Sequence, residues 1–160
     1  MSATRDRAPR SLRVPADVGQ LAAVRSFVRM GALRAGLPGA GIEDLVCAVD
    51  ESVTNSIVHG YAGAAGFIDV LLEADDEALT IRITDTAPPY DPRTAPAPAP
   101  GGPLSGRRPG GYGVGLMRQL TDRLDYAAAP GGGNEVTLVK RFGPRTGGSA
   151  DADHDAAGRG

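Results

Sequence analysis

The segment from Thr86 to Gly115 is the sequence feature that most limits how this chain can fold. Its 30 residues contain eight prolines and seven glycines, including an Ala-Pro repeat from Ala95 to Pro100. Such a segment is extended and cannot build a core, because proline lacks a backbone N–H and glycine is costly to order. The core must therefore come from the residues on either side, and this segment is expected to form a long loop outside the core.

Helical and strand periodicities flank this loop on both sides. Before it, apolar residues recur at helical spacing from Asp17 to Gly36 and from about Gly41 to His59. The second of these helices carries the stripe Ile42, Leu45, Val46, Val49, Val53 and Ile57. The remaining expected elements are a short strand at 11–14, strands at 67–73 and 79–85, a helix at 114–122, and strands at 124–128 and 135–142. This order predicts an α/β two-layer sandwich with the helices on one face of a mostly antiparallel sheet.

Composition excludes several functional classes. Lysine plus arginine is 17 and aspartate plus glutamate is 19, so the net charge of -2 argues against nucleic-acid coating and polybasic membrane binding. The single cysteine, Cys47, excludes an intramolecular disulfide and a thiolate zinc site. The single lysine, Lys140, lies outside any Gly-Lys-Ser/Thr loop, which excludes a P-loop. The polar N-terminus and the lack of a membrane-length apolar run predict a cytoplasmic protein.

Glu51 and Asn55 lie one turn apart on the second predicted helix, opposite its apolar stripe. A solvated helix face explains such a pair, and Glu-x-x-x-Asn is a common spacing. The same face also carries Cys47, Thr54 and Val58, however, and these are poor surface residues. A carboxylate beside an amide oxygen on a half-covered face suits a site for an ion and a phosphate.

Asp85 ends a predicted strand and shares the parity of Leu79, Ile81 and Ile83, so it should point toward the core. An inward carboxylate needs a hydrogen-bond donor. That donor is either a loop amide before Pro88 or a group on a ligand, such as an exocyclic amine.

A glycine-rich run, Gly110-Gly111-Tyr112-Gly113-Val114-Gly115, opens the last predicted helix. Glycines admit a ligand close to the backbone, and the first amides of a helix bind phosphate. The alternative is a flexible hinge that closes the loop.

These features, in this order, resemble the Bergerat-fold (GHKL, histidine-kinase-like) ATP-binding domain. Four segments resemble its anti-sigma-factor serine/threonine kinase subfamily: ESVTNSIVHGY (51–61), DTAPPYDP (85–92), GGYGVGLMRQLTDRLDY (110–126) and NEVTLVKRF (134–142). The resemblance covers about residues 11–142. It implies a folded domain over 11–142 with a flexible ATP lid at about 88–110, a disordered lead at 1–10 and a disordered polar tail at 143–160.

The resemblance also implies roles for individual residues. Glu51 would be the base that orients or deprotonates the attacking hydroxyl, and Asn55 would supply an oxygen to Mg²⁺ on the ATP phosphates. Asp85 would accept a hydrogen bond from the adenine amine. The remaining nucleotide-binding positions implied are Ala87, Gly111, Gly113, Val114, Gly115, Leu116 and Thr137. Ala87 stands where the family usually has a glycine.

The expected function is therefore an ATP- and Mg²⁺-dependent serine/threonine protein kinase that acts as an anti-sigma regulator. Its implied partners are a STAS-domain anti-anti-sigma protein as substrate, a sigma factor that it sequesters, and a second copy in a homodimer, with no direct contact to nucleic acid or membrane. The alternative is a non-catalytic, ATP-gated partner-switching protein of the same fold. Glu51 favours the kinase, whereas Ala87 leaves room for the alternative. A third alternative is a generic two-layer domain that binds no nucleotide.

Overall fold

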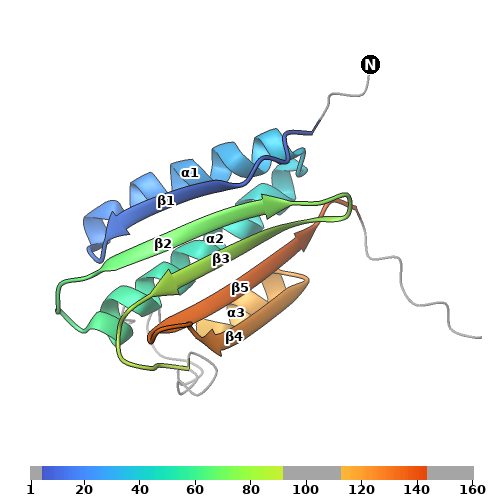
Figure 1. Ribbon diagram of the computed structural model, residues 1–160. Helices are drawn as coiled ribbons and strands as arrows, with labels where there is room; N and C mark the ends of the chain where they lie inside the picture. The colour runs from blue at the N-terminus through green and yellow to red at the C-terminus, as the bar shows by residue number, and fades with distance from the viewer. Residues whose placement is uncertain (1–4, 92–112, 144–160) are drawn as a thin grey trace, which may run out of the picture.

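In the part of the chain that the structure describes, a five-stranded antiparallel sheet forms one layer, and three α-helices cover one of its faces (Figure 1). The computed structural model describes residues 5–91 and 113–143. The strand order is β1-β2-β3-β5-β4, and every neighbouring pair is antiparallel. The strands are β1 (Arg10–Pro15), β2 (Phe67–Ala74), β3 (Ala78–Asp85), β4 (Arg123–Ala128) and β5 (Asn134–Arg141). The helices are α1 (Leu21–Ala35), α2 (Gly39–Asn55) and α3 (Gly113–Leu120). The predicted two-layer α/β architecture is confirmed.

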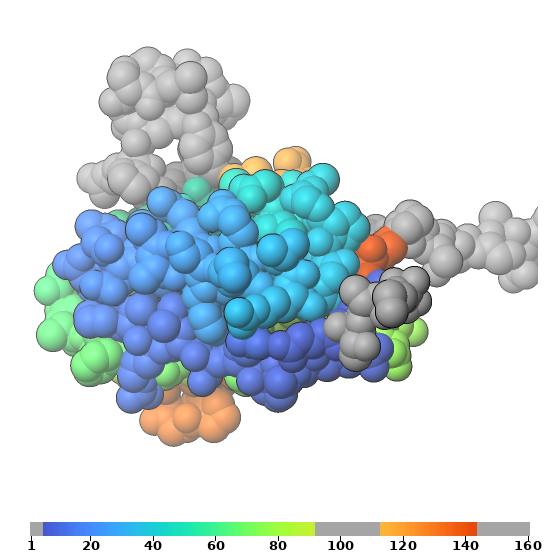
Figure 2. All heavy atoms as spheres, turned by 90° about the horizontal axis from the view of Figure 1, so that it is seen from above, coloured from blue at the N-terminus to red at the C-terminus, as the bar shows by residue number. Residues whose placement is uncertain are grey.

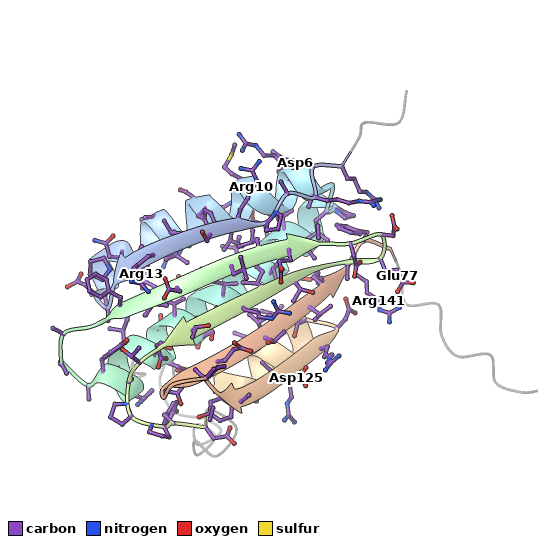
Figure 3. The ribbon with its side chains drawn as sticks, in the orientation of Figure 1. Asp6, Arg10, Arg13, Glu77, Asp125 and Arg141 are labelled. Carbon is purple, nitrogen blue, oxygen red and sulfur yellow. The ribbon has the colours of Figure 1, made fainter. Side chains whose placement is uncertain are left out.

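Strand alternation determines which side chains enter the space between sheet and helices. On β3, Leu79, Ile81 and Ile83 are at most 2% exposed, whereas Thr80, Arg82 and Thr84 are half-buried on the opposite face. Asp85 continues the inner row at 4% exposed, as its parity predicts. The opposite face of the sheet carries charged pairs, including a two-point ion pair between Arg13 of β1 and Asp69 of β2 at 2.8 Å (Figure 3).

The first helix ends where the sequence predicts but begins differently. Gly36 ends α1 in the left-handed conformation, with φ of 86°, which glycine adopts without a steric penalty. Asp17 does not cap α1 itself. Its carboxylate accepts a 2.6 Å hydrogen bond from the Gly19 N–H and caps a separate 3₁₀ turn, Val18–Gln20, that leads into the helix.

The second helix departs from the prediction at its C-terminal end. The α-helical geometry stops at Asn55, and residues Ser56–Tyr61 form one π-helical turn instead of extending the α-helix to His59. Tyr61, the last residue of this turn, makes tertiary contacts through its hydroxyl. Its hydroxyl donates to the Phe67 carbonyl at 2.5 Å and accepts from the Thr86 N–H at 3.0 Å, which joins the start of β2 to the end of β3.

Helix packing against the sheet relies on one small residue and one long one. At Gly31 of α1, an added Cβ would lie 2.4 Å from the Cδ2 atom of Leu72 on β2, so a larger residue here would force the Leu72 side chain to move. Seen from above, α1 lies beside β1 and α2 (Figure 2). Lys140 of β5 donates to the Leu120 carbonyl at the end of α3 at 2.8 Å and pairs with Asp44 of α2 at 3.1 Å. The lone lysine of the chain thereby connects both helices to the sheet.

Residues 5–10 contact the rest of the domain. Arg10 already belongs to β1, opposite Leu72, and the Asp6 N–H donates to the Arg34 carbonyl at 3.1 Å. Asp6 and Arg10 form an ion pair (Figure 3), and the Arg5 guanidinium lies 4.4 Å from the centre of the Phe142 ring. These contacts order residues 5–9 against the end of α1, a contribution that local sequence does not reveal. The expected lid at 88–110 and tail at 143–160 lie mostly outside the described residues. Within the described ranges, no helix is long and apolar enough to span a membrane.

Candidate functional site

The C-terminal part of α2 carries Asn55, which lines a small pocket, and Glu51 one turn earlier, which is not among the lining residues. Asn55 is 4% exposed and Glu51 is half-buried. The Asn55 Oδ1 and Glu51 Oε2 atoms are buried without a hydrogen-bond partner among the described residues. A buried polar oxygen without a partner costs about 1–3 kcal/mol, so two of them one turn apart indicate groups kept for a ligand. The solvated-face alternative for this pair does not fit this burial.

Glu51 also contacts the start of α3. The Gly113 N–H hydrogen-bonds to its carboxylate, which places this side chain at the N-terminal end of that helix. Burial raises the pKa of Glu51 above its usual value, and the neighbouring charge of Asp50 raises it further, while the Gly113 hydrogen bond opposes both effects. A raised carboxyl pKa is typical of general bases and acids at active sites.

The glycine-rich entry of α3 is open to a ligand. Gly113 has φ of 52°, in the left-handed region, and a Cβ placed on Gly113 or Gly115 would meet no heavy atom of residues 5–91 or 113–143 within 4 Å. Val114 and Leu116 are half-buried beside them, whereas Gly111 lies outside the described residues. The first amides of α3 are thus accessible to an anion next to Glu51.

Asp85 lies at the opposite side of the pocket, at the end of β3. Its Oδ1 accepts hydrogen bonds from the Ala87 N–H at 3.0 Å and from the Asn134 Nδ2 at 2.8 Å. The loop-amide alternative considered from the sequence therefore holds for one of the two carboxylate oxygens. The second oxygen takes no part in either of these bonds.

The pocket is lined by α2, the π-helical turn, the loop after β3, and β5. Its lining residues are Ser52, Asn55, Ser56, Gly60, Asp85, Tyr90, Asn134 and Val136. The Ser52 Oγ atom is another buried oxygen without a partner among the described residues. Tyr90 stacks on His59 with ring centres 5.6 Å apart. Of these lining residues, sequence reasoning selected only Asn55 and Asp85.

Ala87 and Thr137 differ in how they relate to this pocket. Ala87 is 2% exposed and is not a lining residue; a Cβ placed on Gly60 would lie 3.1 Å from the Ala87 Cβ. Its methyl group therefore packs against the Gly60 backbone. Thr137 is opposite Arg82 and Asp125 on the outer face of the sheet, while its neighbour Val136 lines the pocket. The structure does not bring Thr137 to the site.

Asn134 is one of the lining residues that sequence reasoning missed, and it contacts Asp85 directly. It begins β5 directly opposite Asp85, and 49 residues separate the two along the chain. The sequence did contain a signal for Asn134. Asn55 and Asn134 are the only asparagines of the chain; Asn55 lies within the segment 51–61 and Asn134 begins the segment 134–142, and both segments resemble the kinase subfamily.

Comparison with known proteins identifies the family of this chain. Residues 14–140 match the model of the histidine kinase-like ATPase domain. The chain belongs to this family. Within the histidine kinase-like ATPases, it is similar to the serine-protein kinase RsbW of Staphylococcus aureus, with 30% identity over 128 residues, 75% of this chain and 79% of that protein. It is also similar to the anti-sigma F factor of Clostridium acetobutylicum, with 29% identity over 105 residues, 63% of this chain and 71% of that protein.

A solved structure supports the fold assignment of this histidine kinase-like ATPase. The crystal structure of the RsbU and RsbW domains of a Mycobacterium tuberculosis protein superposes with a TM-score of 0.61 and 22% identity. The superposition covers 84% of this chain, which spans 32% of that longer protein. At this level of identity the likeness shows a common fold.

Proposed function

We propose that this protein is an ATP-dependent serine/threonine protein kinase that phosphorylates a STAS-domain anti-anti-sigma protein. One observation carries the proposal: one oxygen of Glu51 and one of Asn55, each without a hydrogen-bond partner among the described residues, are buried one helical turn apart, and Glu51 contacts the N-terminus of α3. Phosphoryl transfer requires positioned groups and charge neutralisation around the phosphates more than covalent chemistry. The named relatives, anti-sigma F factors and serine-protein kinases, support this substrate class.

The residues present fit a Mg²⁺–ATP complex. The Asn55 Oδ1 atom has no hydrogen-bond partner among the described residues, so it is available as a metal ligand. Hard oxygen ligands are those that Mg²⁺ prefers. Mg²⁺ in nucleotide sites keeps several waters and is held largely by the substrate phosphates, so the protein need supply few oxygens, and Asn55 Oδ1 would be one of them. When bound, the ion neutralises charge on the phosphates.

The protein groups divide the remaining tasks. Asp85 accepts a hydrogen bond from the adenine amine through the carboxylate oxygen that Ala87 and Asn134 leave free. The amides at the start of α3, next to Gly113 and Gly115, hold phosphate oxygens. Glu51 orients the hydroxyl of the incoming serine or threonine and takes its proton, a task for which a raised pKa is suited.

A sigma factor is the second partner of this proposal, because anti-sigma F factors are among the relatives. The protein would hold the sigma factor until a STAS-domain protein competes for it, and phosphorylation would end that competition. The reaction is assigned to the cytoplasm, the compartment that supplies ATP. A homodimer stays a prediction.

The test is transfer of label from [γ-³²P]ATP to a purified STAS-domain partner. Label on the partner supports the kinase, and ATP binding without label on any candidate partner supports the alternative of an ATP-gated binding protein. Glu51→Gln is the matched variant, because it keeps the size of the side chain and removes the base. Absence of ATP binding by the unmutated protein would contradict both functions.

A further inference from the structure

Asn134 uses every hydrogen-bonding position of its side chain on other protein groups. It is 4% exposed. Its Nδ2 donates to Asp85 Oδ1 at 2.8 Å and to the Pro88 carbonyl at 3.1 Å, and its Oδ1 accepts from the Tyr90 N–H at 2.7 Å and from the Tyr126 hydroxyl at 2.5 Å. A carboxamide offers two donors and two acceptor lone pairs, so no capacity remains for a ligand. Asn134 therefore acts through the groups that it holds.

The Tyr126 hydroxyl and the Tyr90 amide determine which way the carboxamide faces. The Tyr90 N–H can only donate and the Tyr126 hydroxyl also donates here, so the oxygen of Asn134 lies toward them and the NH₂ group lies toward Asp85. Tyr126 reaches this position from β4, where it is opposite Val136 and two residues from Ala128, the direct partner of Asn134. A flipped carboxamide would place its oxygen against the Asp85 carboxylate and lose both accepted bonds.

The consequence falls on the two oxygens of Asp85. Asn134 and the Ala87 N–H both bind Oδ1, which leaves Oδ2 as the acceptor for a ligand. The backbone of β5 supports the same arrangement. A Cβ on Gly133 would lie 1.9 Å from the Asp85 carbonyl oxygen, so the chain passes directly against Asp85 at this point.

We propose that Asn134, oriented by Tyr126, is a positioning residue that turns one oxygen of the Asp85 carboxylate toward the exocyclic amine of the base and thereby establishes selectivity for adenine. This inference rests on the proposed function, because it assumes that the pocket holds the base of ATP. A merely structural cross-link between β3, β4 and β5 would affect stability and the affinity for all nucleotides alike.

The experiment compares ATP with purine riboside triphosphate, which lacks only the exocyclic amine. Dissociation constants of both nucleotides are measured with Mg²⁺ by calorimetry. The variants are Asn134→Leu, which removes every hydrogen bond of the carboxamide, and Tyr126→Phe, which removes only the hydroxyl. Glu135→Gln is the control, because Glu135 is adjacent on β5 and lies on the outer face, opposite Thr84.

The unmutated protein and Glu135→Gln should bind the analogue about 10–100-fold more weakly than ATP, the usual effect of a hydrogen bond to a charged group. In Asn134→Leu this ratio should fall below about threefold through loss of ATP affinity, with analogue affinity nearly unchanged. Tyr126→Phe should give an intermediate ratio. It also provides the test of the proposal if Asn134→Leu fails to fold.

A ratio that persists in folded Asn134→Leu or Tyr126→Phe overturns the role of Asn134 and leaves the kinase proposal intact. Equal binding of both nucleotides by the unmutated protein overturns the role of Asp85 as well. Failure of the unmutated protein to bind ATP overturns the proposed function itself.

Discussion

At the scale of single residues, Glu51 is the group whose environment differs most from that of an ordinary surface glutamate. One of its oxygens is buried without a partner among the described residues. Burial and the neighbouring charge of Asp50 both raise the pKa of its carboxyl group. Both effects destabilise the charged form. Such a cost in the ligand-free protein is consistent with a group that is retained for catalysis.

Glu51→Gln should abolish most phosphate transfer while leaving ATP affinity nearly unchanged. A general base contributes about 10²–10⁴-fold in rate, and the loss should lie at the lower end if the proton leaves late in a loose transition state. Single-turnover transfer and a separate ATP titration measure the two quantities. Transfer at the unmutated rate would remove Glu51 from the mechanism.

The raised pKa of Glu51 also predicts a pH dependence of stability. In the unfolded chain the carboxyl loses its proton near its usual pKa of 4.5, whereas the folded protein retains the proton to higher pH. The folded state is therefore penalised as pH rises through the folded-state pKa, and the penalty is absent below the unfolded pKa. Glu51→Gln should melt at a higher temperature than the unmutated protein at pH 7, and this difference should vanish below about pH 4. A difference that grows on acidification contradicts the assignment.

Ala87→Gly tests whether the methyl group impairs the nucleotide pocket. Because that methyl packs on Gly60 and is not part of the pocket lining, removal should change ATP affinity by less than about threefold. Stability should fall by about 1–2 kcal/mol, since a buried methyl is lost and the unfolded chain gains freedom. A large gain in ATP affinity would show that the alanine does obstruct the base.

At the scale of elements, the turn between β4 and β5 determines how closely β5 approaches Asp85. Gly132 and Gly133 both have left-handed φ values, 101° and 98°, but only Gly133 faces the backbone of Asp85 and Thr86. The two glycines thus separate the cost of a left-handed conformation from the cost of a steric clash.

Gly133→Ala should destabilise the protein by about 3 kcal/mol or more, because the new methyl would collide with the Asp85 carbonyl in addition to the strained φ. Gly132→Ala is the matched control. Its Cβ would meet no heavy atom within 4 Å, so only the left-handed strain of about 1–2 kcal/mol applies. Urea unfolding of both variants measures the difference, and equal losses would contradict the close approach.

At the scale of the whole molecule, a ligand that bridges α2, the end of β3 and the start of α3 should stabilise all parts together. ATP with Mg²⁺ at 100 times its dissociation constant should add about 2.7 kcal/mol to the free energy of unfolding. For a chain of this length, that is a rise in melting temperature on the order of 5–10 °C. Calorimetry with ATP–Mg²⁺ and with Mg²⁺ alone checks this, and a shift of less than about one degree at millimolar ATP contradicts a nucleotide site.

The elements and their inward faces were determined by the sequence itself. Helical and alternating periodicities are local, so α1, α2, β2, β3 and the inward direction of Asp85 could be predicted from neighbouring residues alone. The family resemblance likewise depended on short segments, and it led to Glu51, Asn55 and Asp85 as candidate residues.

Only the tertiary structure decided how the pocket is closed. Asn134 meets Asp85 because β5 pairs with β3 in one register, and Val136 rather than Thr137 faces the pocket for the same reason. The π-helical turn after Asn55 ends in a tyrosine that reaches Phe67 and Thr86. These contacts join residues far apart in the chain, and strand register and turn geometry depend on packing across the whole sheet, which local periodicity does not contain.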